Sequence, residues 1–304
     1  MDSIAPIAYF TYNRPNHTKI SLDALKKNEL AALSEIIIYS DGPKNDKNDK
    51  KKVEEVRDIL NSLDGFKKKT LIFRKINYGL YKNFVNGITE VCNNHKKVIV
   101  VEDDNKTSRY FLNFINDGLN LYENDSSVCS INGWFYPKEN NLQETFFLTG
   151  GNTWGWGTWK RAWDKFNPDT KFLIDQIKKK NLVKKFNYND SYDYFSMLEK
   201  RHNKQNESHT IIWKASTFIN NMFSLYPYIS FVENIGFDGT GRHNKKPDNL
   251  HKHTLLHEKK IKLAKIKIEE NINAIKFIEK FYRKFRYKRF IKKVINKIFK
   301  KNNY

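Results

Sequence analysis

A short apolar run that ends in three acidic residues constrains this chain most strongly. Residues 97–101 (Lys-Val-Ile-Val-Val) are rich in β-branched side chains, a pattern that predicts a buried strand of a parallel sheet. Glu102, Asp103 and Asp104 follow directly. Adjacent like charges repel each other and lose solvation when they are buried. A divalent cation bound at this strand end would offset both costs. Carboxylate oxygens suit Mg²⁺ or Mn²⁺ that also holds a substrate's phosphates; the alternative is a strand end with solvated acids.

The first 104 residues repeat a strand–helix rhythm. Short β-branched or aromatic runs alternate with stretches whose apolar residues recur at helical spacing. Strands that alternate with helices predict an α/β fold with a mostly parallel central sheet and right-handed crossovers. The predicted strands are 4–12, 35–40, 70–73 and 98–101, and the predicted helices are 17–27, 53–63 and 81–91.

Each of these strands is followed by polar residues. In a parallel sheet the carboxyl ends of the strands meet at one edge, where ligands bind. We therefore expect these polar strand ends to converge on one site. They are Asn13-Arg14, Asp41-Gly42, Asn77-Tyr78-Gly79-Leu80 and Glu102-Asp103-Asp104.

The rhythm changes after residue 104. We expect helices at 108–122 and 213–225, strands at 128–131 and 228–232, and loops at 150–159 and 234–243. The first loop mixes glycine with three tryptophans, whose flat faces suit sugar rings or bases, although tryptophan is also a common core residue. We expect one tryptophan to bind ligand and the others to pack in the core. The predicted domain spans 1–253, with a nucleotide-binding half at 1–104 and an acceptor-binding half at 105–253.

The charge is concentrated at the end of the chain. Residues 259–304 carry 17 Lys and Arg against three acidic residues, a net charge of +14 out of +21. Aromatic and aliphatic residues recur there at helical spacing, which predicts a basic amphipathic helical tail over 254–304. Such a helix suits an anionic membrane surface; the alternative is an apolar stripe packed on the body. No nucleic-acid partner is expected, because no zinc finger, RRM signature or basic zipper accompanies the charge.

The compartment is expected to be the cytoplasm. The start of the chain lacks the basic and apolar regions of a secretion signal. The two cysteines, Cys92 and Cys129, have no metal-ligand or CxxC spacing, which favours a reducing compartment.

Five segments together resemble the GT-A nucleotide-sugar glycosyltransferases. The likeness is greatest to bacterial family-2-like sugar transferases related to the N-acetylglucosaminyltransferase I type, and it spans about residues 4–245. The segments are Ala8-Tyr9-Phe10-Thr11-Tyr12-Asn13-Arg14-Pro15, Tyr39-Ser40-Asp41-Gly42-Pro43, Val101-Glu102-Asp103-Asp104, Trp154-Gly155-Trp156-Gly157-Thr158-Trp159 and 234–243.

This resemblance implies a GT-A fold and specific roles for residues of this chain. Asp104 would be the direct ligand of Mn²⁺ or Mg²⁺, and His243 a further metal or phosphate contact. Asp103 would face the ribose or donor sugar of a UDP-sugar. The remaining donor-binding residues would be Arg14, Asp41, Asn77, Gly79 and Leu80, and Trp154, Trp156 and His209 would bind the acceptor.

The resemblance also implies a catalytic base, because the family inverts the anomeric configuration. Glu207 stands where the family has an aspartate, and His209 replaces a tryptophan. Glu207 is therefore the expected base, with His209 as the alternative.

The expected function is an inverting, metal-dependent glycosyltransferase. It would move a sugar from a UDP-sugar to a glycan acceptor, possibly lipid-linked, in bacterial surface polysaccharide or lipopolysaccharide assembly. It would act peripherally at the inner face of the plasma membrane. The alternative is a non-catalytic binding protein of the same fold.

Overall fold

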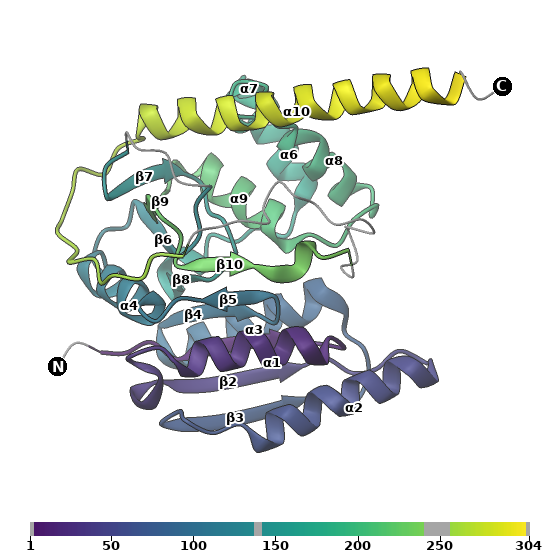
Figure 1. Cartoon of the computed structure of the whole chain (residues 1–304). Helices are drawn as coiled ribbons and strands as arrows, with labels where there is room; N and C mark the ends of the chain where they lie inside the picture. Colours follow the sequence, from purple (N-terminus) through teal and green to yellow (C-terminus); the bar gives the residue numbers. More distant parts are fainter. Residues whose placement is uncertain (1–2, 137–141, 240–255, 302–304) are drawn as a thin grey trace.

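A central eight-stranded sheet, flanked by helices, organises this protein. The computed structural model describes residues 3–136, 142–239 and 256–301, and Figure 1 shows their arrangement. The strand order is β3-β2-β1-β4-β8-β6-β9-β7. The predicted α/β class is therefore confirmed. The strands of this sheet are β1 (Ile7–Thr11), β2 (Glu35–Ser40), β3 (Lys68–Phe73), β4 (Lys97–Glu102), β6 (Val128–Asn132), β7 (Thr145–Thr149), β8 (Trp156–Trp159) and β9 (Phe223–Pro227).

The first half of the sheet is parallel. β1 pairs with β2 and β4, and β2 pairs with β3, all in the same direction. The connecting helices are α1 (Pro15–Lys26), α2 (Lys47–Ser62) and α3 (Gly79–His95). The crossover from β3 to β4 runs back across the sheet, so right-handed connections place α3 on the face opposite α1 and α2 (Figure 1). The strand order thus reverses between β1 and β4, the kind of position where open α/β sheets bind ligands.

The second half of the sheet is mixed. β8 is antiparallel to β4 and β6, β9 is parallel to β6, and β7 is antiparallel to β9. A separate antiparallel pair joins β5 (Asn105–Thr107) to β10 (Val232–Asn234). Because β5 directly follows the acidic end of β4, the pairing of β10 with β5 brings the residues after β10 to that acidic end.

A helical layer forms a second, smaller core. Buried residues such as Leu173, Leu198 and Ile212 come from three of its helices and pack together. Ser208 starts the last helix of the layer, since its side chain accepts a hydrogen bond from Ile211 N. The helices of this half of the chain are α4 (Phe111–Leu121), α5 (Lys160–Trp163), α6 (Thr170–Lys179), α7 (Val183–Phe186), α8 (Tyr194–His202) and α9 (His209–Ile219).

Three predicted elements of the second half are wrong. The helix expected at 213–225 ends at Ile219, because Asn221 takes the left-handed conformation (φ 51°) and the chain enters β9. The strand expected at 228–232 does not form in the described part of the chain: β9 ends at Pro227, and β10 begins only at Val232. The end of the expected loop 150–159 forms β8 between β4 and β6.

The predicted C-terminal tail packs on the body over its first half. α10 (Ile272–Lys301) buries Ala274, Ile278 and Tyr282 in the main core. The Tyr282 hydroxyl lies 2.6 Å from the Tyr136 hydroxyl, and Asn271 N donates to Phe147 O at 2.9 Å. This part of α10 therefore packs on the body, and Figure 1 shows the end of α10 reaching past the helices beneath it. No helix in the described ranges is long and apolar enough to cross a bilayer.

We expect Ile278→Ala to lower the free energy of unfolding by about 2–4 kcal/mol, since the side chain is fully buried. Urea denaturation measures this loss. Lys280→Ala, on the exposed side of the same helix, is the control and should change little. Equal stability of the two variants would show that α10 does not pack on the body in solution.

Candidate functional site

The acidic end of β4 lies beside the end of β1. The register pairs Phe10 with Glu102, and Thr11 with Ser40 of β2, so the segments after these strands leave the sheet together. Asp103 Oδ2 accepts hydrogen bonds from Thr11 Oγ1 at 3.2 Å and from Tyr12 N at 3.4 Å. The carboxylate of Asp103 therefore bridges two neighbouring strand ends at the reversal of strand order.

Asp104 is surrounded by polar groups from three segments. Its Oδ1 accepts from Asn105 Nδ2 at 2.9 Å and from Asn234 Nδ2 at 3.4 Å, and its Oδ2 lies 3.4 Å from Arg14 Nη1. Gly236 passes so close that an added Cβ would lie 2.5 Å from Asp104 Oδ2. The expected convergence is thus observed for Arg14, Asp103 and Asp104, and the segment after β10 joins them.

Burial disfavours the ionised forms of the three carboxylates at the end of β4. Burial, followed by the Asp104 carboxylate, raises the pKa of Asp103 to about 7. Burial also raises the pKa of Asp104 and that of Glu102, while the Arg14 guanidinium acts in the opposite direction on all three. A cation placed here would remove the penalty on the ionised forms.

The donor set fits a hard divalent cation. Mg²⁺ is commonly held by one or two carboxylates together with substrate phosphates rather than by an all-protein cage. Across the described ranges, no group of three or more His, Cys, Asp or Glu side chains is arranged to hold a metal ion. Asp104 can supply one carboxylate, whose second oxygen faces Arg14. The predicted ligand His243 lies outside the described residues.

The structure adds two residues that the sequence did not single out. His17 Nε2 lies 2.8 Å from Arg14 Nη2 and 3.1 Å from Asp238 Oδ2, and Asp238 Oδ1 lies 3.8 Å from Arg14 Nη2. Burial and the Arg14 charge lower the pKa of His17. Ile235 N donates to Asp104 O at 2.8 Å and holds this segment against the strand end. Arg14 therefore faces two carboxylates, from distant parts of the chain.

Asp41 organises the turn before α3. Its Oδ1 accepts from Gly42 N and Tyr78 N, both at 2.8 Å, and its Oδ2 accepts from Gly79 N at 3.0 Å and from Asn77 Nδ2 at 3.2 Å. Gly79 has a φ of +76°, which favours glycine. Three predicted donor-site residues (Asp41, Asn77 and Gly79) thus form one hydrogen-bonded cluster.

The other predicted donor residue of this turn has an apolar environment. Leu80, in the first turn of α3, packs partly buried against the main core. It can form a wall beside the turn.

Glu207 and His209 occupy different environments. Glu207 is half-buried, and its Oε2 lies 3.9 Å from the position that a Cβ would take on Gly79, so it borders the Asp41 turn. His209 is 3% exposed and stacks on Phe84 with ring centroids 4.3 Å apart. Burial lowers the pKa of His209 to about 3, and neither ring nitrogen has a hydrogen-bond partner among the described residues. His209 is a core residue here, not an accessible base or acceptor contact.

The two candidate tryptophans, Trp154 and Trp156, also differ in their burial. Trp154 is half-buried and lies edge-on to Trp134 and Phe237, with centroids 4.5 Å and 5.5 Å away, next to the segment that covers Asp104. Trp156 has no exposed surface and packs against Trp213 at 5.4 Å. A fully buried ring cannot stack on an acceptor in this arrangement, so the acceptor role expected of Trp156 is corrected to a core role. Trp154 remains the aromatic candidate.

Comparison with known proteins gives only distant likeness. No family model matches the chain, and no curated protein matches it. Among solved structures, S. aureus TarS matches at 16% identity and a TM-score of 0.30, over 46% of this chain and 23% of that one. A second structure of the same protein, TarS 1-349, matches at 11% identity and a TM-score of 0.38, over 74% of this chain and 60% of that one.

A third similar structure is the mannosyltransferase PcManGT from Pyrobaculum calidifontis in complex with GDP-Man and Mn²⁺. It is 14% identical, with a TM-score of 0.31, over 45% of this chain and 36% of that one. The chain spans less than two thirds of the length of each of these proteins. Likeness of this degree does not establish a family, and the function proposed for this chain rests on its own site.

Proposed function

We propose that this protein is an inverting, metal-dependent glycosyltransferase that moves a sugar from a UDP-sugar to a glycan acceptor. One observation carries the proposal: the acidic end of β4 lies where the strand order reverses, with Arg14 beside it and with Asp41 held at the end of β1 by its N–H, which donates to Thr11 O. Ligands of open α/β sheets bind at such a reversal. Carboxylates there suit a cation-bound diphosphate better than a neutral ligand, because a bound cation would offset the cost of burying their charge.

The roles follow from the chemistry of each group. Asp104 would hold Mn²⁺ or Mg²⁺, which when bound would offset the charge on the leaving diphosphate. Asp103 would face the ribose or donor sugar, and Arg14 and Asp41 would contact the uracil and ribose of the UDP. Asn77 and Gly79 would form the wall of the nucleotide-sugar site together with Leu80.

Glu207 would act as the general base. Its carboxylate borders the Asp41 turn, and it can accept the proton of an acceptor hydroxyl. The hydroxyl oxygen then bonds to the anomeric carbon while the bond from that carbon to the diphosphate oxygen breaks and UDP leaves. Trp154, half-exposed beside the segment over Asp104, offers a ring face to the acceptor sugar.

Asp104→Asn tests donor binding. We expect UDP with Mn²⁺ to raise the melting temperature of the wild type in a thermal-shift assay, and this shift to be lost in the variant because an amide binds a hard cation poorly. Asp175→Asn removes an exposed carboxylate from α6 and should keep the full shift. An unchanged shift in Asp104→Asn would place the cation elsewhere and contradict the proposal.

Glu207→Gln separates binding from transfer. We expect the variant to keep the UDP–Mn²⁺ thermal shift and to lose roughly 10²-fold or more of its UDP release from candidate UDP-sugars, the range of general-base catalysis. Glu199→Gln, on α8 and paired with Lys178, is the matched control. Normal turnover by Glu207→Gln would exclude it as the base. A wild type that binds UDP but releases none would favour the non-catalytic binding protein.

We also propose that the far part of α10 brings the enzyme to an anionic membrane surface, where a lipid-linked acceptor of a surface polysaccharide or lipopolysaccharide would lie. Residues 288–304 carry seven Lys and Arg and no acid. Each basic residue near such a surface contributes about 1 kcal/mol.

Deletion of residues 288–304 tests this localisation. The deletion leaves Ala274, Ile278 and Tyr282, which are buried in the core, so the melting temperature should change little. We expect co-sedimentation with phosphatidylserine-containing vesicles to be lost, and binding to neutral phosphatidylcholine vesicles to be weak in both proteins. Equal sedimentation of the two proteins with anionic vesicles would rule out this role for the helix end.

A further inference from the structure

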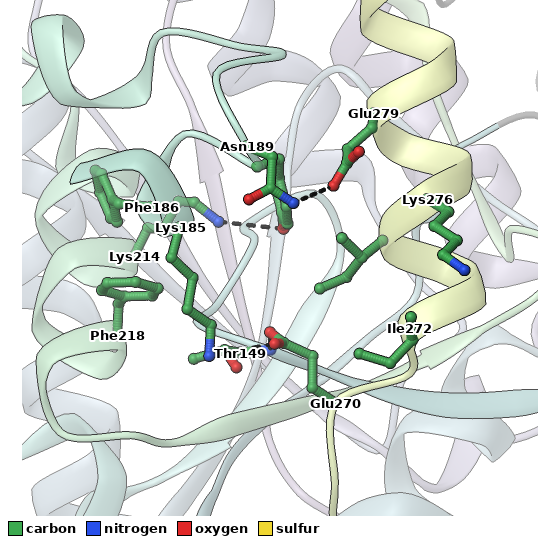
Figure 2. A pocket seen from close by; sticks show the side chains of 12 residues that line it. Thr149, Lys185, Phe186, Asn189, Lys214, Phe218, Glu270, Ile272, Lys276 and Glu279 are labelled. Atoms are coloured by element: carbon green, nitrogen blue, oxygen red, sulfur yellow. Dashed lines mark hydrogen bonds and ion pairs between the residues drawn. The ribbon is translucent and has the colours of Figure 1, made fainter. Parts of the chain in front are cut away.

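A cavity lies away from the acidic strand end, between α7, α9 and the start of α10. Its volume is about 420 Å³, which is in the range of small-molecule sites. Figure 2 shows Lys185 and Phe186 on one side of it and Lys276 and Glu279 of α10 on the other. None of its lining residues belongs to the site described above.

Lys214 of α9 is the unusual member of this cavity. Its side chain lines the cavity although the residue is only 7% exposed. Its ammonium donates a hydrogen bond to the Tyr188 hydroxyl at 3.3 Å, and no carboxylate of the described residues lies within 4.0 Å of it as an ion-pair partner. Burial lowers the pKa of Lys214 to about 8, against the opposing effect of Glu270.

Aromatic rings surround this ammonium. The ring centroids of Tyr188, Tyr194 and Phe186 lie 4.6, 4.7 and 5.9 Å from Lys214 Nζ. Such contacts stabilise a cation only in part, and buried charges in proteins are normally paired. An anion that enters the cavity would complete the environment of Lys214.

The two carboxylates on the lining form ion pairs with other cations. Glu270 pairs with Lys185 at 3.2 Å, and Glu279 pairs with Arg283 at 3.6 Å. Lys276 adds a further exposed positive charge from α10. The cavity therefore offers three lysines, against two paired carboxylates, beside apolar ring surface.

We propose that this cavity binds a sugar-sized molecule with one anionic group, a phosphate monoester or a carboxylate, which pairs with Lys214. The apolar rings suit the C–H faces of a sugar ring, and the polar side chains of Thr149 and Asn189 on the lining can hydrogen-bond to its hydroxyls. This binding site is independent of the proposed glycosyl transfer.

The test is a thermal-shift measurement on the full chain with glucose 6-phosphate, glucuronate and, as the uncharged probe, glucose. We expect at least one anionic probe to raise the melting temperature while glucose does not, and the responding probe distinguishes phosphate from carboxylate. The shift should persist with saturating UDP and Mn²⁺. No shift with either anionic probe, or a shift that UDP and Mn²⁺ abolish, would overturn the proposal.

Two variants locate the binding. Lys276→Glu places a negative charge on the cavity lining and should reduce the shift, whereas Lys280→Glu makes the same charge change one turn further along the exposed side of α10 and should retain it. Equal responses of these two variants would overturn the assignment.

Lys214→Met tests the central contact. It should abolish the shift, and it should raise the melting temperature of the ligand-free protein, because a buried ammonium without an anionic partner is replaced by an apolar side chain. A lower melting temperature together with an unchanged response to the anionic probe would give Lys214 a purely structural role and overturn the proposal.

Discussion

The reversal of strand order between β1 and β4 determines where the candidate site of this protein lies. α1 and α2 lie on one face of the sheet and α3 lies on the other, as the reversal of strand order between β1 and β4 requires. β4 ends there in Glu102, Asp103 and Asp104. Burial raises the pKa values of all three, and neighbouring carboxylates raise those of Glu102 and Asp103 further, so a cation at this edge of the sheet would stabilise the ionised forms.

The parallel half could be predicted from the sequence because its signals are local. Short β-branched runs mark β2 and β4, and helical spacing of apolar residues marks α2 and α3. The rule that parallel strands end at one edge then brings Arg14, Asp41 and Asp104 to that edge without any knowledge of long-range contacts. The contacts of Asp238 with Arg14 and His17 could not be predicted in this way, since they depend on the pairing of β10 with β5.

The errors in the second half come from residues that serve packing and resemble functional ones. A Cβ added to Gly157 of β8 would lie 2.6 Å from Ile115 Cγ2 of α4. This glycine therefore allows β8 and α4 to pack closely, and it does not serve the approach of a ligand. The aromatic and β-branched residues Trp156, Thr158 and Trp159 were a signal for a strand. The Asn220-Asn221 pair was a signal for the end of α9, since asparagine tolerates the left-handed conformation after a helix. The burial of His209 had no signal in the sequence.

The Asp41 carboxylate has a consequence for how a nucleotide can enter. Two carboxylate oxygens offer about four lone-pair sites, and four donors from its own loop and the turn before α3 already occupy them. An incoming ribose hydroxyl can bond to Asp41 only in exchange for one of those donors. Binding of a ribose hydroxyl to Asp41 and loosening of this turn would therefore occur together. The mobility of the turn would then report whether a nucleotide is bound.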